Sequence, residues 1–473
     1  MSLSVVACNN IQIAPFQLKE LVELKMERGI NRHATLYFTG VVPEELKDSY
    51  IDKTKCETQL EVSLVNNGEN TPLFKGIALS VEIRAVRNVY YIEVEAVSNT
   101  YILDVELKSR SFQNKGMSYG ELVKKVISDY PGTDFMDVAS DGKSIEKFTM
   151  QYQETDWEFL KRMASRFNTG LVADSISEKP KFYFGVNKKA SNKALEEYHY
   201  SVRKKVSDFR ISSENYIKEI DENDFIYYEV ETGEFIDIGS EVDFKGRSLF
   251  VCESFTWMED GILRHRYTLA SEKGLSQNNI YNDKIIGLSI EGEVIEVAKD
   301  NLKVHLEIDK EQDKGGAWWF PYSTGYTAEG SSGWYCMPEL KDHVLVHFPD
   351  NKEENGVSIS SVRKDSEKAE NNKVDNPDVK YFRTKSGKEL MFSPEEILIS
   401  AKDGEIFIKL NDKDGIQIFS TKPVKITTKE DLVMVADKNV VMTAKDNINL
   451  KCKESTLIMD GSVSIKGKEV KTN

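Results

Sequence analysis

Histidine and cysteine, the side chains most used in metal sites and nucleophilic catalysis, are scarce in this sequence. There are six histidines and five cysteines among 473 residues. The cysteines Cys8, Cys56, Cys252, Cys336 and Cys452 are odd in number and widely separated, which fits neither a disulfide framework nor a paired-cysteine metal site. Their distribution indicates a chain that is synthesised in a reducing compartment.

A long apolar run and a leader segment are also missing. No apolar run approaches the roughly 18 residues that a spanning helix needs. The N-terminal MSLSVVACNN lacks a basic region followed by an apolar core and a cleavage site. We therefore expect synthesis and assembly in the cytoplasm without a signal peptide, and any passage outward by another route.

The common catalytic motifs are absent. The sequence has no G-x-S-x-G, H-E-x-x-H or P-loop pattern. His343 and His347 are four residues apart, but they flank the strand-like run Val344-Leu-Val346, where this spacing does not give helical ligand geometry. We expect a protein that is not an enzyme, with no catalytic, cofactor-binding or metal-binding residues and no cofactor.

Basic residues are fewer than acidic ones, 63 against 78, so the net charge is −15. This balance argues against a general nucleic-acid binder. The charge is unevenly placed: residues 402–473 hold 13 lysines against 11 acidic residues, a net of +2, which leaves −17 for the remainder. The 40% hydrophobic content is ample for packed cores.

The most informative feature present is a row of apolar pairs that recur every eight residues near the C-terminus. A spacing of two within each pair puts both side chains on one face of a strand. The pairs are Ile408/Leu410, Ile416/Ile418, Val424/Ile426, Leu432/Met434, Val440/Met442 and Ile448/Leu450, continued by Thr456/Ile458.

Such a repeat predicts a strand and a turn in each pass, which is typical of a β-helix. One eight-residue pass is too short to bury its own pair, so we expect several identical chains to wind around a common axis. A β-sandwich also returns strands every 8–12 residues or so, but the unbroken register of seven pairs favours the intertwined β-helix.

Upstream of the repeats, the sequence predicts strands with two helices among them. Residues 1–110 and 181–272 are rich in alternating strand patterns. Two capping boxes, Ser118-Tyr-Gly-Glu121 and Thr155-Asp-Trp-Glu158, each precede an apolar stripe and predict helices near residues 118–130 and 155–168. Polar linkers are expected at 274–283 and 364–378.

The stretch Gln151-Tyr-Gln-Glu154-Thr-Asp156-Trp-Glu-Phe159-Leu-Lys-Arg162, followed by Gly170, resembles a known motif. It is the Q-Y-x-E-x-D-x-x-F-x-x-R motif of contractile-injection spike proteins, a family that includes the VgrG proteins of type VI secretion and the hub-spike proteins of contractile phage tails. On its own, the segment is a strand that leads into a capped helix.

Two later segments resemble the same family in the same order. Residues 287–363 resemble its OB-fold through the Trp318-Trp319-Phe320-Pro321 turn, the Met337-Pro338-Glu339 loop and the Val344-Leu-Val-His-Phe348 strand. These residues are not basic, so we interpret both tryptophans as core or subunit contacts rather than a nucleotide-stacking platform. The segment Arg383-Thr-Lys-Ser-Gly387-Lys388 resembles the R-T-x-S-G-H start of the spike, with Lys388 in place of the usual histidine.

The resemblance covers nearly the whole chain and implies a mainly β fold of four parts. Barrel-like hub domains with a few helices would occupy residues 1–273. An OB-fold would occupy 285–363, a linker 364–380, and an intertwined triple-stranded β-helix spike 381–473. It further implies a homotrimer, whose two related β-barrel-like domains per chain form a pseudo-six-fold ring.

The function implied is the spike and baseplate hub of a contractile injection system. Such a trimer plugs the inner tube and pierces the target envelope when the sheath contracts. Its partners would be a six-fold tube protein and baseplate proteins, with no nucleic acid and with membrane contact only on firing. On this reading the trimer-axis core comprises Ile416, Ile418, Val424, Ile426, Leu432, Met434, Val440, Met442, Ile448 and Leu450.

The resemblance also implies a partner at the spike tip. In the family, a small conical cap protein or an effector often sits on a blunt tip, and the polar tail here fits such an end. The expected cap-binding residues are Gly461, Ser462, Val463, Ile465 and Val470.

Two alternatives come from other classes of protein. A carbohydrate-active β-helix enzyme needs clustered carboxylates on a concave face, and an eight-residue pass leaves little room for one. A passive adhesin fibre would not need the hub or the OB module.

Overall fold

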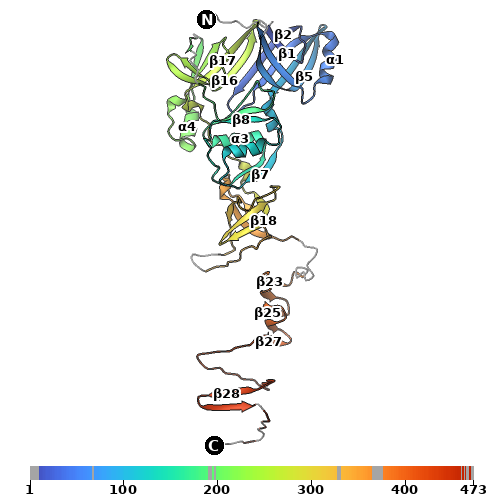
Figure 1. Ribbon diagram of the computed structural model, residues 1–473, viewed down its shortest axis with the longest axis vertical. Helices are drawn as coiled ribbons and strands as arrows, with labels where there is room; N and C mark the ends of the chain where they lie inside the picture. The colour runs from blue at the N-terminus through green and yellow to red at the C-terminus, as the bar shows by residue number, and fades with distance from the viewer. Residues whose placement is uncertain are drawn as a thin grey trace. The chain divides into compact units, whose positions relative to one another are not determined.

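Strands dominate both compact units into which the chain divides, Met1–Asp365 and Ser366–Asn473 (Figure 1). The computed structural model describes residues 10–66, 69–189, 194–196, 199–326, 332–364, 376–459, 461, 462, 464, 468 and 469. The regions expected as hub and OB-fold both lie in the first unit, and the boundary between them at 273–285 stays a prediction.

Six strands at the start of the first unit form one half of a twelve-stranded sheet. They are β1 (Ile11–Ala14), β2 (Glu20–Gly29), β3 (Thr35–Val42), β4 (Gln59–Asn66), β5 (Glu69–Val86) and β6 (Val89–Ser98). They pair in the order β1-β4-β5-β6-β3-β2. Alternate residues, such as Leu36 and Phe38 in β3 and Ile92 and Val94 in β6, are buried in their core, as the period of two in a strand requires.

A second set of six strands, in the other half of the sheet, repeats this arrangement. They are β12 (Ala194–Leu195), β13 (Tyr200–Lys204), β14 (Ile226–Thr232), β15 (Glu241–Phe244), β16 (Arg247–Glu259) and β17 (Ile262–Ala270). They pair in the order β12-β15-β16-β17-β14-β13, so both sets follow the order 1-4-5-6-3-2 when numbered along the chain. The first unit therefore contains the same module twice, although the first pair is antiparallel in one and parallel in the other.

Two helices that the sequence analysis missed flank these modules on opposite sides in Figure 1. They are α1 (Lys47–Lys53) and α4 (Val206–Asn215). Neither has a side-chain cap, and each buries one residue, Tyr50 in α1 and Ser212 in α4. Without a cap or an apolar stripe, neither segment carries the usual signals of a helix.

Residues 99–189 lie between the modules in the sequence and contain the two helices that were predicted. The elements are β7 (Lys108–Phe112), α2 (Tyr119–Ile127), β8 (Asp134–Asp137), β9 (Thr149–Glu154), α3 (Asp156–Ser165), β10 (Leu171–Ala173) and β11 (Lys181–Phe184). Both predicted capping boxes are present with both of their hydrogen bonds, at Ser118 for α2 and Thr155 for α3. Their apolar faces share one core around Trp157, Phe159 and Phe182.

A five-stranded antiparallel sheet follows where an OB-fold was expected. Its strands are β18 (Ser289–Ala298), β19 (Asn301–Leu306), β20 (Trp319–Pro321), β21 (His343–His347) and β22 (Val357–Val362), in the order β20-β19-β18-β21-β22. Short 3-10 helices connect elements of this unit: η2 (Glu44–Leu46), η3 (Asn99–Asp104), η4 (Glu222–Phe225), η5 (Lys273–Leu275), η6 (Asp283–Ile285) and η7 (Glu353–Asn355). The core of the five-stranded sheet includes Phe148 and Met150, which come from the segment before α3.

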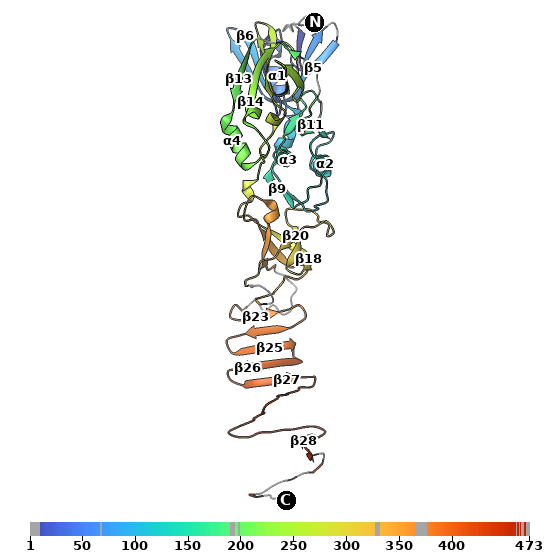
Figure 2. The same cartoon turned by 90° about the vertical axis from the view of Figure 1, so that its left-hand side faces the viewer.

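The second unit holds seven strands in the part of it that the structure describes. Five form a meander in sequence order: β23 (Lys380–Arg383), β24 (Glu389–Phe392), β25 (Glu396–Lys402), β26 (Ile406–Asn411) and β27 (Gly415–Ser420) (Figure 2). A hairpin of β28 (Ile448–Cys452) and β29 (Ser455–Met459) follows.

A buried histidine lies beside the seam where the two modules join. The seam is the antiparallel pairing of β2 with β16, in which Met26 lies opposite Thr256. The Thr256 hydroxyl lies 2.8 Å from Nδ1 of His265, a side chain on the neighbouring strand β17. Burial, assisted by the positive charge of Arg28, lowers the pKa of His265 to about 4, so the ring is neutral near pH 7.

We expect this histidine to make the first unit less stable in mild acid. In the unfolded chain a histidine has a pKa of about 6.5. Between about pH 6.5 and 4 the unfolded chain binds the additional proton, so stability falls as pH falls, by at most about 1.4 kcal/mol per pH unit. Urea midpoints at pH 7 and pH 5 should therefore differ less in His265→Gln than in the wild type. His199→Gln, at an exposed position, should keep the wild-type difference; an unchanged difference in His265→Gln would contradict this assignment.

Candidate functional site

The family motif forms a closed network of charges at the start of α3. Asp156 is fully buried and accepts hydrogen bonds from Lys108 Nζ at 2.9 Å and from Arg110 Nη2 at 2.5 Å. It also accepts from Gln151 Nε2 at 2.9 Å and from the Tyr130 hydroxyl at 2.8 Å. Burial and the Asp156 carboxylate raise the pKa of Tyr130 to about 12. The carboxylate is fully engaged, which suits a structural role better than proton transfer.

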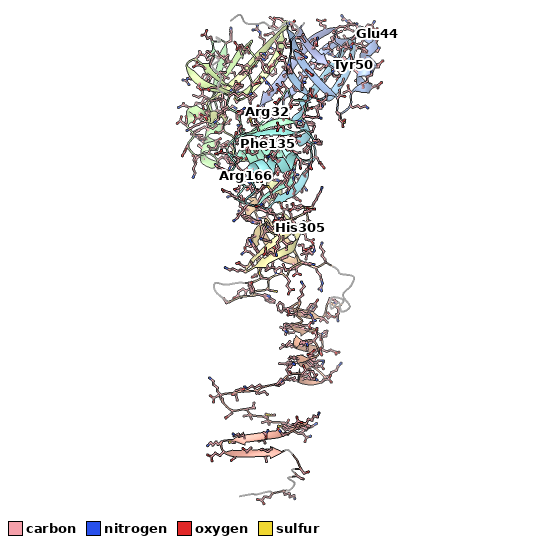
Figure 3. All side chains as sticks on the ribbon, viewed as in Figure 1. Arg32, Glu44, Tyr50, Phe135, Arg166 and His305 are labelled. Carbon is pink, nitrogen blue, oxygen red and sulfur yellow. The ribbon has the colours of Figure 1, made fainter. Side chains whose placement is uncertain are left out.

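The arginine of the motif joins α3 to the five-stranded sheet module. Arg162 is buried and donates two hydrogen bonds to Glu154, at 2.8 and 2.7 Å, and one to the carbonyl of Met150 at 2.6 Å. Its Nη1 donates to Glu353 of η7 at 2.5 Å. The second oxygen of Glu353 accepts from Arg166 at 2.7 Å, and Figure 3 labels Arg166 between α3 and the sheet that carries His305.

Glu154, Arg162, Arg166 and Glu353 together form one cluster, the ionic junction. Burial opposes the charge of Arg162, but the carboxylates of Glu353 and Glu154 raise its pKa well above the usual range. Because each buried charge has a partner of opposite sign, the junction is satisfied as a whole and intolerant of the loss of one member. Together with the apolar contacts of Phe148 and Met150, it fixes the sheet module to the hub.

The start of the second unit is held by another set of ionic contacts. Arg383 donates to the buried carboxylate of Glu389 at 2.8 Å and also pairs with Asp403. Lys388, which replaces the usual histidine, donates from Nζ to the carbonyl of Ala401 at 2.6 Å. Lys388 therefore links the turn that precedes β24 to β25.

The meander presents two unbroken apolar columns across its strands. Opposed residues in successive pairs are Leu390, Ile399, Ile408 and Ile418 in one column and Phe392, Ile397, Leu410 and Ile416 in the other. All eight side chains are exposed in the single chain, and Ile416 and Ile418 reach 73% and 63%. A contiguous exposed apolar face of this kind is typical of an interaction surface.

The next 27 residues keep the eight-residue period without forming a strand within the chain. Residues 421–447 are all described and none belongs to a helix or strand. Bends fall at residues 421–422, 429–430, 437–438 and 445–446, each eight residues from the last. The apolar pairs lie in the extended pieces between bends, and all are exposed. Extended backbone outside a sheet takes its hydrogen-bond partners from water or from another chain.

Comparison with known proteins agrees with the resemblance of the motif at residues 151–162. Residues 47–168 match the family model described as phage tail baseplate hub (GPD). A component of the E. coli type VI secretion system, described as similar to the T4 bacteriophage tail proteins gp27 and gp5, matches with a TM-score of 0.53 and 13% identity. That match covers 75% of this chain and 99% of the other.

Chains of the Francisella PdpA-VgrG complex match over more of the sequence. The lidded form gives a TM-score of 0.54 at 10% identity and covers 86% of this chain and 79% of the other; the lidless form gives 0.52 at 12% identity and covers 86% and 97%. This chain has the VgrG-type hub-spike fold. No curated protein sequence matches it significantly.

Within the VgrG-type fold, the structure brings together the motif residues that the sequence singled out. Gln151, Glu154, Asp156 and Arg162 lie in one network. No local pattern marks their partner Glu353, which lies in the acidic stretch Asp350–Glu354. Only the folded structure shows that this residue, rather than its acidic neighbours, contacts Arg162. The ten predicted trimer-axis residues are described and lie in the apolar pairs, and their place on an axis stays a prediction.

Other singled-out residues occupy ordinary positions in the VgrG-type fold. Trp318 packs against the core of the five-stranded sheet, while Trp319 is 37% exposed with Lys303 Nζ 4.8 Å from its ring centre. His343 pairs with Glu291 at 2.9 Å, and His347 lies 3.0 Å from the Ser289 hydroxyl.

Every helix in the described residues is too short or too polar to cross a membrane. Of the predicted cap-binding residues, Gly461 and Ser462 are exposed, and Val463, Ile465 and Val470 lie outside the described residues.

Proposed function

We propose that the protein is the trimeric spike and baseplate hub of a contractile injection system. The observation that carries this proposal is the pair of exposed apolar columns, continued by the unpaired eight-residue repeats of residues 421–447. The match of residues 47–168 to a baseplate hub supports the hub role.

A trimer would bury the apolar columns and pair the backbone groups that one copy leaves exposed. When three meanders face a common axis, the columns become a buried core, and burial stabilises the assembly by about 25 cal/mol per Å² of apolar surface removed from water. Strands of neighbouring copies pair with residues 421–447 and satisfy their backbone groups. The result is a stiff needle, and stiffness is what piercing an envelope requires.

The first unit would provide the baseplate end of this machine. Two related modules per chain give six modules in a trimer, which matches a six-fold inner tube that the hub would plug. The ionic junction would transmit the push of the tube from the hub to the sheet module, which precedes the spike in the sequence. At the other end, residues 461–470 would take up a small cap protein or an effector.

The proposal is tested by locating the chain in assembled particles. A short epitope tag placed after Asn473, labelled with gold, should appear in electron micrographs as a cluster at one pole of the particle. The same tag on the sheath protein should decorate the length of the particle and shows that the label can bind. Gold along the tube, or on particles without any baseplate, would contradict the proposed position.

A further inference from the structure

The two modules of one chain are joined by pairing of two strands, and the equivalent strand edges on the other side of each module have no such partner among the described residues. In the seam, β2, the second strand of the first module, pairs antiparallel with β16, the fifth strand of the second module. The corresponding second strand of the second module is β13, and the corresponding fifth strand of the first module is β5. Among the described residues, β13 pairs with β14 alone.

The free edge of β5 is the same edge that β16 uses in the seam. On that side, β16 pairs first with β15, up to Phe250, and then with β2, from Glu253 to Trp257. On β5, the partner strand β4 ends its pairing at Ile77. The following residues of β5, up to Val86, pair with β6 on the opposite side only.

Both long hairpins carry a register shift at the same place, which allows the modules to be aligned residue by residue. The shift falls between Ala78 and Ser80 in β5 and between Val251 and Glu253 in β16. Counted from the shift, Ile83 takes the place of Thr256, Glu82 that of Phe255, and Val81 that of Ser254.

The second strands of the two modules, β2 and β13, can be aligned in the same way, by following their paired residues across each sheet to the register shift. Met26 lies opposite Leu36, which lies opposite Ala96. In the second module, Val202 lies opposite Tyr228, which lies opposite Leu269. Ala96 and Leu269 in turn face the residues just before the two shifts, Ala78 and Val251. Val202 therefore takes the place of Met26, and Arg203 and Lys204 take the places of Glu27 and Arg28.

We propose that β13 of one copy pairs antiparallel with β5 of the next copy, and that this strand pairing joins neighbouring hubs. The seam inside the chain sets the register. Because Met26 lies opposite Thr256, Glu27 opposite Phe255 and Arg28 opposite Ser254, Val202 lies opposite Ile83 of the neighbouring copy, Arg203 opposite Glu82 and Lys204 opposite Val81. The inference rests on the trimer of the proposed function and adds the surface by which its hubs join.

The chemistry of these residues suits the pairing. All five residues of β13 are exposed in the single chain. They include the apolar side chain of Val202, which is 52% exposed and which the pairing would bury. Opposite it, Ile83 packs at the margin of the first module's core. Arg203 and Glu82 have opposite charges, and directly opposed residues of opposite charge favour antiparallel pairing.

A groove beside β5 accommodates the residues that come directly after β13. It has a volume of about 760 Å³ and is lined by apolar side chains that include Ile51, Leu79 and Val105. In the seam, the chain leaves β2 at Ile30, whose N–H donates to the carbonyl of Cys252 at 3.4 Å and whose side chain packs against the second module's core. The residue in the place of Ile30 is Val206, the first of α4, which is 48% exposed. The pairing would carry Val206 past Leu79 and into the groove.

Cysteine pairs test the register directly. In full-length protein with Cys8, Cys56, Cys336 and Cys452 replaced by serine, Val202→Cys together with Ile83→Cys should give disulfide-linked dimers and trimers on a non-reducing gel after mild oxidation. Each single variant should give none, because β13 and β5 lie far apart in the strand order of one copy, so two like positions of neighbouring copies do not meet. As a matched control, Val202→Cys with Ser80→Cys places the thiols three residues, roughly 10 Å, apart and should not link.

The outcomes separate this inference from the proposed trimer. A protein of trimer mass in which the 202–83 pair does not link, or links no better than the 202–80 pair, would overturn the strand pairing and leave the trimer standing. A protein of monomer mass would overturn both. In the second arm, Arg203→Glu and Glu82→Arg should each speed amide exchange of β13 at least threefold in the intact trimer, and the double variant should restore it. Exchange at the wild-type rate in both single variants would overturn the pairing.

Discussion

Replacement of Met442 by aspartate should destabilise the assembled spike by about 3 kcal/mol or more per chain. Met442 belongs to the apolar pair Val440/Met442, in the extended stretch between the bends at 437–438 and 445–446. In a trimer with these pairs on the axis, loss of a buried methionine already costs about 2–5 kcal/mol. Three carboxylates brought together in an apolar core add desolvation and repulsion, and the carboxyl pKa should rise. Thermal unfolding of the full-length protein measures the effect.

Thr443→Asp provides the matched control. Successive residues of an extended strand face opposite sides, so this change places the same charge one residue away, on the solvent side. It should alter the midpoint little. Equal loss of stability in Met442→Asp and Thr443→Asp would show that the register of the apolar face is wrong.

Replacement of Glu353 by alanine should destabilise the first unit by about 3–5 kcal/mol. The carboxylate of Glu353 accepts from Arg162 at 2.5 Å and from Arg166 at 2.7 Å, and Arg162 is buried. The substitution leaves a buried guanidinium short of one of its two carboxylates. The loss should be visible as a lower urea midpoint and as faster amide exchange in α3 and the five-stranded sheet.

The adjacent residue offers the comparison. Glu354 pairs with Lys147 at 2.6 Å, but both side chains are partly in solvent, at 28% and 43% exposed. Glu354→Ala should cost less than about 1 kcal/mol. If Glu354→Ala proved as costly as Glu353→Ala, the acidic stretch as a whole, and not the ionic junction, would be the source of stability.

Local signals account for what the sequence predicts well. The capping boxes at Ser118 and Thr155 need only a few neighbouring residues, and both are present as predicted. The mainly β fold and the resemblance to VgrG-type spikes are confirmed by the structure and by the comparisons. The eight-residue spacing of the apolar pairs reappears as bends at the same interval, because polar turn residues separate the extended pieces.

Contacts between distant segments account for what the sequence does not show. Glu353 is bound to Arg162 across 191 positions, and nothing in its own neighbourhood marks it. The duplication of the hub module is carried by strand pairing order and one register shift, not by shared residues: Val202 stands where Met26 stands, and Arg203 where Glu27 does. α4 was missed because its contacts within the chain bury only Ser212.

Light scattering of the purified protein tests the central claim, that identical chains complete the spike. At micromolar concentration the full-length protein should have three times the mass of one chain. A truncation after Asp378, which removes the apolar columns and the repeats, should be less stable or monomeric. A stable full-length monomer would contradict the account.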